Sequence, residues 1–291
     1  MTEWIYLGPM GRMVALEVPS GGYKHDLVEY GSEHVPLSGQ RTKDIVSVRN
    51  EFEIETDGLS PRALSWLRML YVEAIPGPIY LRESSERNLL RARISSTSST
   101  IANLPGAVDW VIPGVGDAVG AVTAANLTLP CAVPGEEVTM APYRVLTWTA
   151  AGSNRTLADA ALIPVLPGEV LCFSAYVQSG TPTLEIVPYN AALVAQAPIT
   201  GTSIIAGTPP RRYVTYTVPS NGTIVAVQVQ LRLAAAGSTF THAWQLETGT
   251  ATPRGWQLGL GVPKVMMTGD AQGDRHGIGT YTAGTYQLKE I

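Results

Sequence analysis

Alternating apolar and polar positions recur along the chain and predict many short β-strands. The clearest run covers residues 225–233, where the apolar positions are Val225, Val227, Val229, Leu231 and Leu233. Between them stand Ala226, Gln228, Gln230 and Arg232. This period of two is typical of a strand with one face in a core and the other in water. Shorter runs at 171–177, 184–186 and 213–218, separated by Pro-Gly and Asn-Gly turns, predict a two-sheet sandwich over residues 109–262.

The pattern changes before this region, where one helix is expected among strands. Residues 45–54 alternate as a strand with one wet face. Ser60 can cap a helix that starts at Pro61, and Leu64, Leu67 and Leu70 follow at helical spacing. Residues 76–78, Pro-Gly-Pro, end it. We therefore expect an α+β unit over residues 1–108.

Two more strands are expected at the end of the chain, at 262–267 and 286–291. Two strands are not stable alone, so they must complete a sheet elsewhere. The first unit is the natural host, because insertions usually enter a domain at an exposed loop. We therefore predict a discontinuous domain, residues 1–108 and 263–291, with residues 109–262 inserted into it.

Composition narrows the function classes. Charged residues make up only 15% of the chain and the net charge is −4, so the basic surface of a nucleic-acid-binding protein is missing. The start lacks the basic and apolar regions of a signal peptide, and no apolar run is long enough to span a bilayer. We expect a protein made in a cytoplasm, with no membrane partner. Cys131 and Cys172 stand alone in the sequence, which favours two reduced, buried thiols over a zinc site.

Three stretches resemble distal tail proteins and other minor tail proteins of long-tailed, siphovirus-type bacteriophages. The first is Gly31 to Thr42 (GSEHVPLSGQRT) with the strand that follows and its Arg49. The second comprises residues 164–169 (PVLPGE), 173–176 (FSAY) and 244–249 (WQLETG), which look like parts of a carbohydrate-binding-module-like jelly roll. The third runs from residues 251–263 to the end (YQLKEI) and is similar to the closing strand of the tail-ring domain.

The resemblance implies a mainly β architecture: a tail-ring β-sandwich with one short helix, plus an inserted jelly-roll sandwich. It implies a ring of identical subunits at the virion tail tip, with a hexamer favoured over a trimer. The partners it implies are the tail tube protein, the tape-measure protein and the tail hub protein. It implies no chemistry.

No catalytic motif accompanies the four histidines, so we expect a protein that is not an enzyme and needs no cofactor. Asp270, Asp274 and His276 share a Gly-rich loop, and the two carboxylates could present oxygens to a structural calcium. A solvated loop is the simpler interpretation. Phe240, His242, Trp244 and Leu246 alternate, which predicts one strand face with His242 in a core or at its rim.

Sugar binding would need exposed aromatic rings beside planar polar groups. The candidates are Tyr176, Tyr189, Tyr213, Gln228, Gln230, Arg232 and Trp244. Three interpretations stay open for them: the wet face of a sandwich, a glycan-binding face, or a contact with another tail subunit.

We predict a structural component of a phage tail tip, a distal tail ring that joins the tube to the hub, with a host-glycan-binding module as an addition. The alternative is a receptor-binding minor tail protein whose main role is adhesion to host-wall polysaccharide. A glycan-degrading enzyme is a third hypothesis, but no acid/base carboxylate pair can be named for it.

Overall fold

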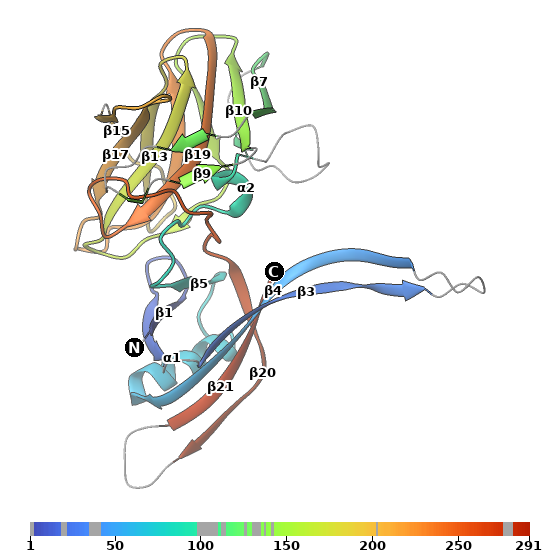
Figure 1. The fold of residues 1–291 in the computed structure, drawn as a ribbon. Helices are drawn as coiled ribbons and strands as arrows, with labels where there is room; N and C mark the ends of the chain where they lie inside the picture. The colour runs from blue at the N-terminus through green and yellow to red at the C-terminus, as the bar shows by residue number, and fades with distance from the viewer. Residues whose placement is uncertain are drawn as a thin grey trace. The chain divides into compact units, whose positions relative to one another are not determined.

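The computed structural model describes residues 3–18, 22–34, 42–97, 110–111, 115–124, 127–129, 135–136, 138–140, 143–201, 203–275 and 282–291. Within them the chain is mainly β, as predicted, with three large antiparallel sheets and two short helices (Figure 1). No helix among these residues is long and apolar enough to cross a membrane. The chain divides into two compact units, Met1–Ser85 with Pro263–Ile291, and Glu86–Val262.

The first unit is built on one seven-stranded sheet in the order β2-β1-β5-β20-β21-β4-β3. Its elements are β1 (Glu3–Gly8), β2 (Val14–Val18), β3 (Tyr23–His34), β4 (Thr42–Leu59), α1 (Pro61–Tyr71), β5 (Ile79–Glu83), β20 (Lys264–Arg275) and β21 (Thr282–Glu290). The two strands from the end of the chain lie between β5 and β4, as the red ribbons of Figure 1 show. Because β5 and β20 pair antiparallel, at Tyr80 with Lys264, the second unit stands where a hairpin loop would otherwise be.

The helix α1 forms where its sequence predicts it. The Ala63 N–H donates to Ser60 Oγ at 3.2 Å, and a proline occupies the first turn. Its Leu67 and Leu70 are buried against sheet residues that include Ile5, Ile54 and Leu288. This core holds the first unit together by removing apolar surface from water.

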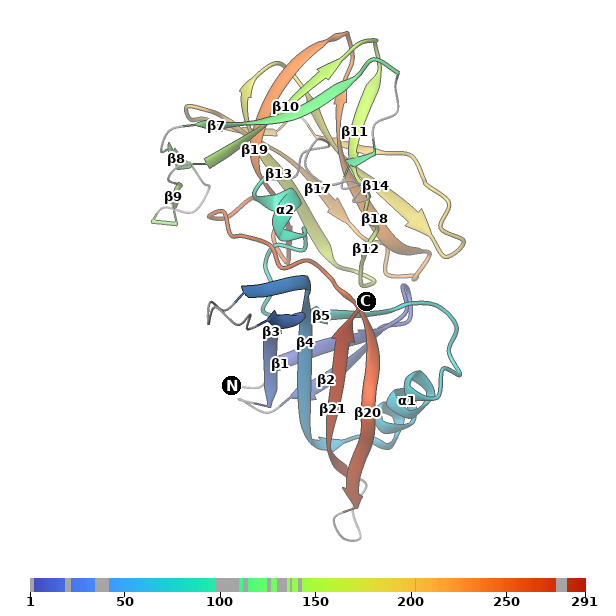
Figure 2. The same cartoon turned by 90° about the vertical axis from the view of Figure 1, so that its right-hand side faces the viewer.

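The second unit is a sandwich of two six-stranded sheets (Figure 2). One, here the β13–β19 sheet, has the order β16-β17-β13-β19-β10-β7. The other, the β14–β18 sheet, has the order β15-β14-β18-β11-β6, with β12 also paired to β18. The bounds are α2 (Ala92–Ser95), β6 (Trp110–Val111), β7 (Ala118–Ala124), β8 (Leu127–Leu129), β9 (Val138–Met140), β10 (Tyr143–Ala150), β11 (Arg155–Asp159), β12 (Ile163–Pro164), β13 (Val170–Ser179), β14 (Thr183–Asn190), β15 (Ile199–Gly201), β16 (Ser203–Ile205), β17 (Arg211–Thr217), β18 (Ile224–Leu233) and β19 (Gly237–Thr248).

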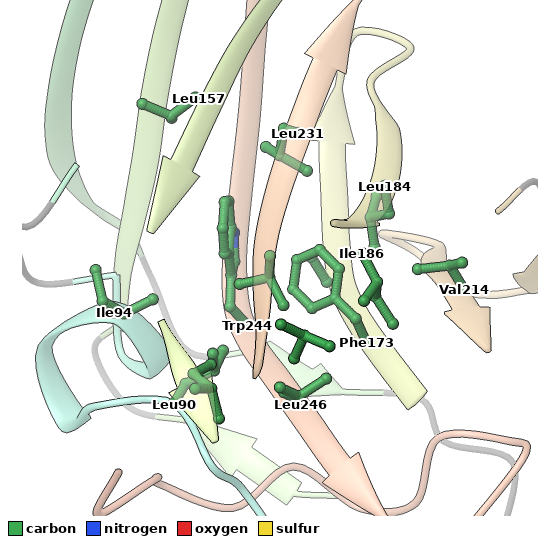
Figure 3. Close-up of a cluster of buried hydrophobic side chains, with 14 of the residues drawn as sticks. Leu90, Ile94, Leu157, Phe173, Leu184, Ile186, Val214, Leu231, Trp244 and Leu246 are labelled. Atoms are coloured by element: carbon green, nitrogen blue, oxygen red, sulfur yellow. The ribbon is translucent and has the colours of Figure 1, made fainter. Parts of the chain in front are cut away.

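The core of the sandwich gathers around Trp244 (Figure 3). Its indole packs edge-on against Phe173 and Trp110, with ring centroids 5.4 Å and 4.9 Å away. The indole N–H donates to Thr241 Oγ1 at 3.0 Å, so the polar atom of this buried ring is satisfied. Truncating such a side chain typically costs about 3–5 kcal/mol. Trp244 is therefore a core residue.

The sequence placed the first boundary of the sandwich after residue 108, and this is wrong. Leu89, Leu90 and Ile94 are buried in the sandwich core, so the second unit begins at Glu86. Asn88 fixes this stretch, because its side-chain amide donates to the carbonyl oxygens of Trp244 and Gln257. The Ser/Thr-rich composition of residues 95–100 marks a boundary less well than these buried leucines do.

Candidate functional site

The seven candidate residues fall on three different parts of the sandwich. Tyr189, Gln228, Gln230 and Arg232 lie together on the outer face of the β14–β18 sheet, here called the ladder face. Tyr213 is half-buried on the other sheet, beside Ser174 in the strand register. Tyr176 and Trp244 are fully buried. The alternation along β18 brings the first group together, since its odd-numbered residues from Val227 to Leu233 are in the core.

The centre of the ladder face is an ion pair that sequence reasoning missed. Glu185 of β14 stands opposite Gln230 of β18 in the antiparallel register. Arg232 Nε donates to Glu185 Oε1 at 2.5 Å, and Gln230 Nε2 donates to Glu185 Oε2 at 2.6 Å. Both carboxylate oxygens therefore accept charge-assisted hydrogen bonds. Glu185 is 2% exposed, whereas the Arg232 side chain is 33% exposed. Glu185 stands between the apolar Leu184 and Ile186, and this was the sequence signal that could have identified it.

Two further hydrogen bonds extend the ladder face along β18. The Tyr189 hydroxyl donates to Gln228 Oε1 at 2.9 Å, and Gln228 Nε2 donates to the Asp159 carbonyl at 2.7 Å. Burial raises the pKa of Tyr189, which keeps the hydroxyl protonated as a donor. From Ala226, opposite Tyr189, to Arg232 the ladder covers six residue steps, or about 20 Å. One ring, two amides and one guanidinium group are thus held in fixed orientations along two neighbouring strands.

The outer face of the β13–β19 sheet, here called the closed face, is different because the chain covers it. Residues 250–257, the return segment after β19, lie across it. Thr215 Oγ1 donates to the Ala251 carbonyl, and Arg87 Nη2 donates to the Gly255 carbonyl. Gly255 has no room for a side chain, since an added Cβ would lie 2.2 Å from the Glu136 carbonyl oxygen. Trp256 packs beside Tyr176, Ala243 and Leu129.

Charged groups lie fully buried under the return segment. Arg211 has no exposed surface, donates to Ser174 Oγ and to the Arg254 carbonyl, and lies 3.9 Å from Glu247. Its guanidinium stacks over the Tyr176 ring at 5.0 Å. Burial raises the pKa of Glu247, against the opposing effect of the Arg254 N–H and the nearby guanidinium groups of Arg211 and Arg87. Tyr176 therefore packs against this buried charged cluster, and the prediction that its ring is exposed for stacking on a sugar is wrong.

The expected single face of Phe240, His242, Trp244 and Leu246 is also wrong. Ala243 has a φ of 51°, and the pairing of β13 with β19 shifts register between Ser174 and Tyr176. This bulge reverses the alternation within β19. His242 therefore stacks on Tyr176 at 5.4 Å on the outer side, whereas Trp244 enters the core. Burial lowers the pKa of His242 to about 4, so its ring is neutral near pH 7.

The structure confirms the predicted buried, reduced thiol at Cys172 and gives no support to a metal site within the described residues. Cys172 is a free, buried thiol, and burial raises its pKa to about 12. Among the described residues no group of three or more His, Cys, Asp or Glu side chains could hold a metal ion. Cys131, His276 and the side chains of Asp270 and Asp274 lie outside the described part. The arrangement that remains is a polar face suited to hydrogen-bonding an extended, hydroxyl-rich ligand.

No protein-family model and no curated protein matches the chain. Among solved structures it is similar to the xylanase 10B CBM22-1–GH10 modules of Clostridium thermocellum complexed with xylohexaose, at 14% identity and a TM-score of 0.34 over 47% of this chain and 26% of that one. Tailspike protein 4 of bacteriophage CBA120 gives 12% identity and a TM-score of 0.37 over 55% and 21%. The CBM22-1 xylan-binding domain from Paenibacillus barcinonensis Xyn10C gives 14% and 0.33 over 54% and 92%.

The matched region thus spans about a quarter or less of the length of the first two proteins. What the comparisons show is a distant structural similarity to carbohydrate-binding β-sandwiches and to a phage tailspike domain.

Proposed function

We propose that this chain is a non-enzymatic structural subunit of a phage tail tip, made in the host cytoplasm and assembled into the virion. In this proposal the first unit forms a ring with copies of itself, a hexamer in preference to a trimer. The ring contacts the tail tube, tape-measure and hub proteins. The sandwich is the module that contacts host-surface glycan.

The observation that carries the proposal is an overhanging ribbon in the first unit. β21 pairs with β4 from Glu51 to Leu59, whereas residues 42–50 of β4 pair only with β3 in the described part of the chain. Figure 1 shows this two-stranded ribbon leaving the sheet. At its base Leu27 is 69% exposed. A two-stranded ribbon is at best marginally stable in water, so a neighbouring subunit is its natural support.

A second feature of the same unit also suits assembly. A groove of about 290 Å³ opens between the end of α1, residues 75–79, β20 and Ile291. Most of the residues that line it have apolar side chains, and Tyr71, Met266 and Ile291 are 40%, 48% and 61% exposed. Apolar surface of this kind on a soluble protein often marks an interface. Ribbon and groove are different surfaces, as the heterologous contacts of a closed ring require.

The test is the assembly state of the purified chain, by light scattering and negative-stain imaging. We expect closed rings. In the key variant, residues 29–48 are replaced by Asn-Gly, which joins Val28 to its register partner Arg49 with a two-residue hairpin turn. This variant should be monomeric. As the matched control, residues 86–262 are replaced by a short loop between the paired strands β5 and β20, which should leave the ring intact. A wild-type protein that stays monomeric at high concentration contradicts the proposal.

A receptor-binding protein is the second candidate, and the ladder face favours it. In this alternative the main role is adhesion to host-wall polysaccharide through Tyr189, Gln228, Gln230 and Arg232. The test is retention of the full chain on host cell walls, compared with a Tyr189→Ala, Gln228→Ala variant. Equal retention of both proteins would exclude the ladder face as the adhesion site.

A further inference from the structure

We infer that Glu185 determines which glycans the ladder face accepts, by cancelling the charge of Arg232 so that neutral chains bind and acidic chains are rejected. This inference rests on the glycan-binding role proposed above. It adds Glu185 as a positioning residue, distinct from the ring and the amides that are proposed to contact the glycan. It also names the class of glycan that binds.

The geometry makes Glu185 the base of the face rather than a contact residue. Its carboxylate is 2% exposed and is reached by Arg232 Nε at 2.5 Å and by Gln230 Nε2 at 2.6 Å. Gln230 is itself buried, at 9% exposed, and its donation to Glu185 fixes the orientation of its amide beside the more exposed Arg232. The guanidinium has five N–H donors, and the contact with Glu185 is made by Nε. The face therefore offers donors and acceptors in fixed positions.

The charge balance decides the ligand class. One buried carboxylate and one guanidinium in direct contact sum to zero, so the face has no net charge with which to attract an acid. A carboxylate or phosphate on a ligand would approach Arg232 but would also approach Glu185, and like-charge contacts of this kind exclude wrong partners. Hydroxyl groups, which both donate and accept, have no such conflict.

A contribution to folding stability explains the Glu185–Arg232 pair less well than the positioning role does. Apolar residues can replace a buried ion pair with no loss of stability, whereas removing one partner is costly. Glu185 lies in the row Thr200, Glu185, Gln230, Ala158 across four strands, where a small or apolar side chain would also fit a sheet surface. A carboxylate that orients two neighbouring donors fits the positioning role.

The experiment compares the full chain with the near-isosteric variant Glu185→Gln, in which Arg232 keeps an oxygen to bond but loses its counter-charge. Binding to immobilised polygalacturonate, an acidic glycan, and to neutral galactan, xylan and β-glucan is measured. Ionic strength is raised from about 0.01 M to about 0.15 M, which shortens the Debye length from about 30 Å to about 8 Å. Glu169→Gln is the matched control, because it makes the same charge change at a turn in the strand connection, where the side chain accepts from the Leu166 N–H.

We expect no binding of the wild type to polygalacturonate. Its binding to neutral glycan should not change with ionic strength. Glu185→Gln should gain about tenfold or more on polygalacturonate, with the gain lost at the higher salt. Glu169→Gln should gain nothing, and the double variant Glu185→Gln, Arg232→Gln should lose the gain, which shows that Arg232 carries it. Thermal unfolding confirms that each variant folds.

The inference is overturned when a folded Glu185→Gln variant binds polygalacturonate no better than the wild type. Failure of the glycan-binding role looks different, since the wild type would then bind neither the neutral glycans nor host cell walls. A gain in Glu185→Gln that persists without Arg232 also counts against the inference.

Discussion

The two outer faces of the sandwich each carry an arginine–glutamate pair, yet only one of these two pairs meets water. On the closed face Arg211 and Glu247 are 0% and 1% exposed, whereas on the ladder face Arg232 keeps 33% of its side chain exposed. The strands themselves are alike, and the return segment makes the difference. Alternation along a strand therefore says which side chains leave the core, and the rest of the chain decides whether they reach solvent.

The sharpest test of this comparison is the buried pair. Arg211→Met leaves the buried Glu247 with Arg87, 3.5 Å away, and should destabilise the second unit by about 3 kcal/mol, the lower end of the usual cost of breaking a buried pair. Urea unfolding followed by tryptophan fluorescence measures it. The double variant Arg211→Met, Glu247→Gln should recover most of the loss. A change under about 1 kcal/mol would mean that water reaches the closed face.

The closed face also predicts sensitivity to acid. Burial lowers the pKa of His242 to about 4 in the folded chain, against 6.5 for an ordinary histidine. As the pH falls from 6.5 to 4 the unfolded chain takes up a proton that the folded chain refuses, so stability should fall, by about 3 kcal/mol in all. Below pH 4 this contribution is constant. His242→Phe, which keeps a ring on Tyr176, should remove this part of the pH dependence whatever its effect at pH 7.

The open pair should respond less. Arg232→Met removes one of two donors to Glu185, but water can reach this edge of the face. We expect a loss of about 1–2 kcal/mol in the same unfolding assay, less than the effect of Arg211→Met. If the two substitutions cost the same, the two faces are equally dry and the contrast between them is wrong.

The smallest effect is expected at the edge of the return segment. A hydrogen bond from Arg254, then one from the Gly255 N–H, lowers the pKa of Glu136 from 4.5 to about 2. Since the folded pKa is the lower one, this contribution is present above pH 4.5 and is lost as the pH falls toward 2. The protection factors for hydrogen exchange at Gly255, Trp256 and Gln257, which correct the exchange rates for the intrinsic effect of pH, should therefore fall over that range. In Glu136→Gln these protection factors should already be lower at pH 7 and should change less with acid.

The sequence predicted those parts of the fold that depend on local pattern. The cap at Ser60, the strand 225–233 and the polar row Gln228, Gln230, Arg232 follow from spacing alone, and the structure has each of them. The β19 error came from one residue, because a left-handed Ala243 shifts every later side chain to the other face and nothing in its neighbours' polarity predicts it. Tyr176 was misplaced because residues 250–257 cover it from more than seventy positions away.

Glu185 was missed because its partners lie about 45 residues along the chain, in a register that a single strand cannot reveal. The tail-ring role, the glycan ligand and the absence of catalysis stay predictions, which the experiments above address.

The pairing of β5 with β20 has a consequence for how such a protein can evolve. The two strands themselves set the register, in which Tyr80 pairs with Lys264 and Ile79 with Val265. This register does not depend on the fold of the segment inserted between them. Recombination at this point could exchange one sandwich for another, or remove it, without repacking the seven-stranded sheet. The sequence of the seven-stranded sheet would then change slowly, while the module between β5 and β20 would be replaced with each new host.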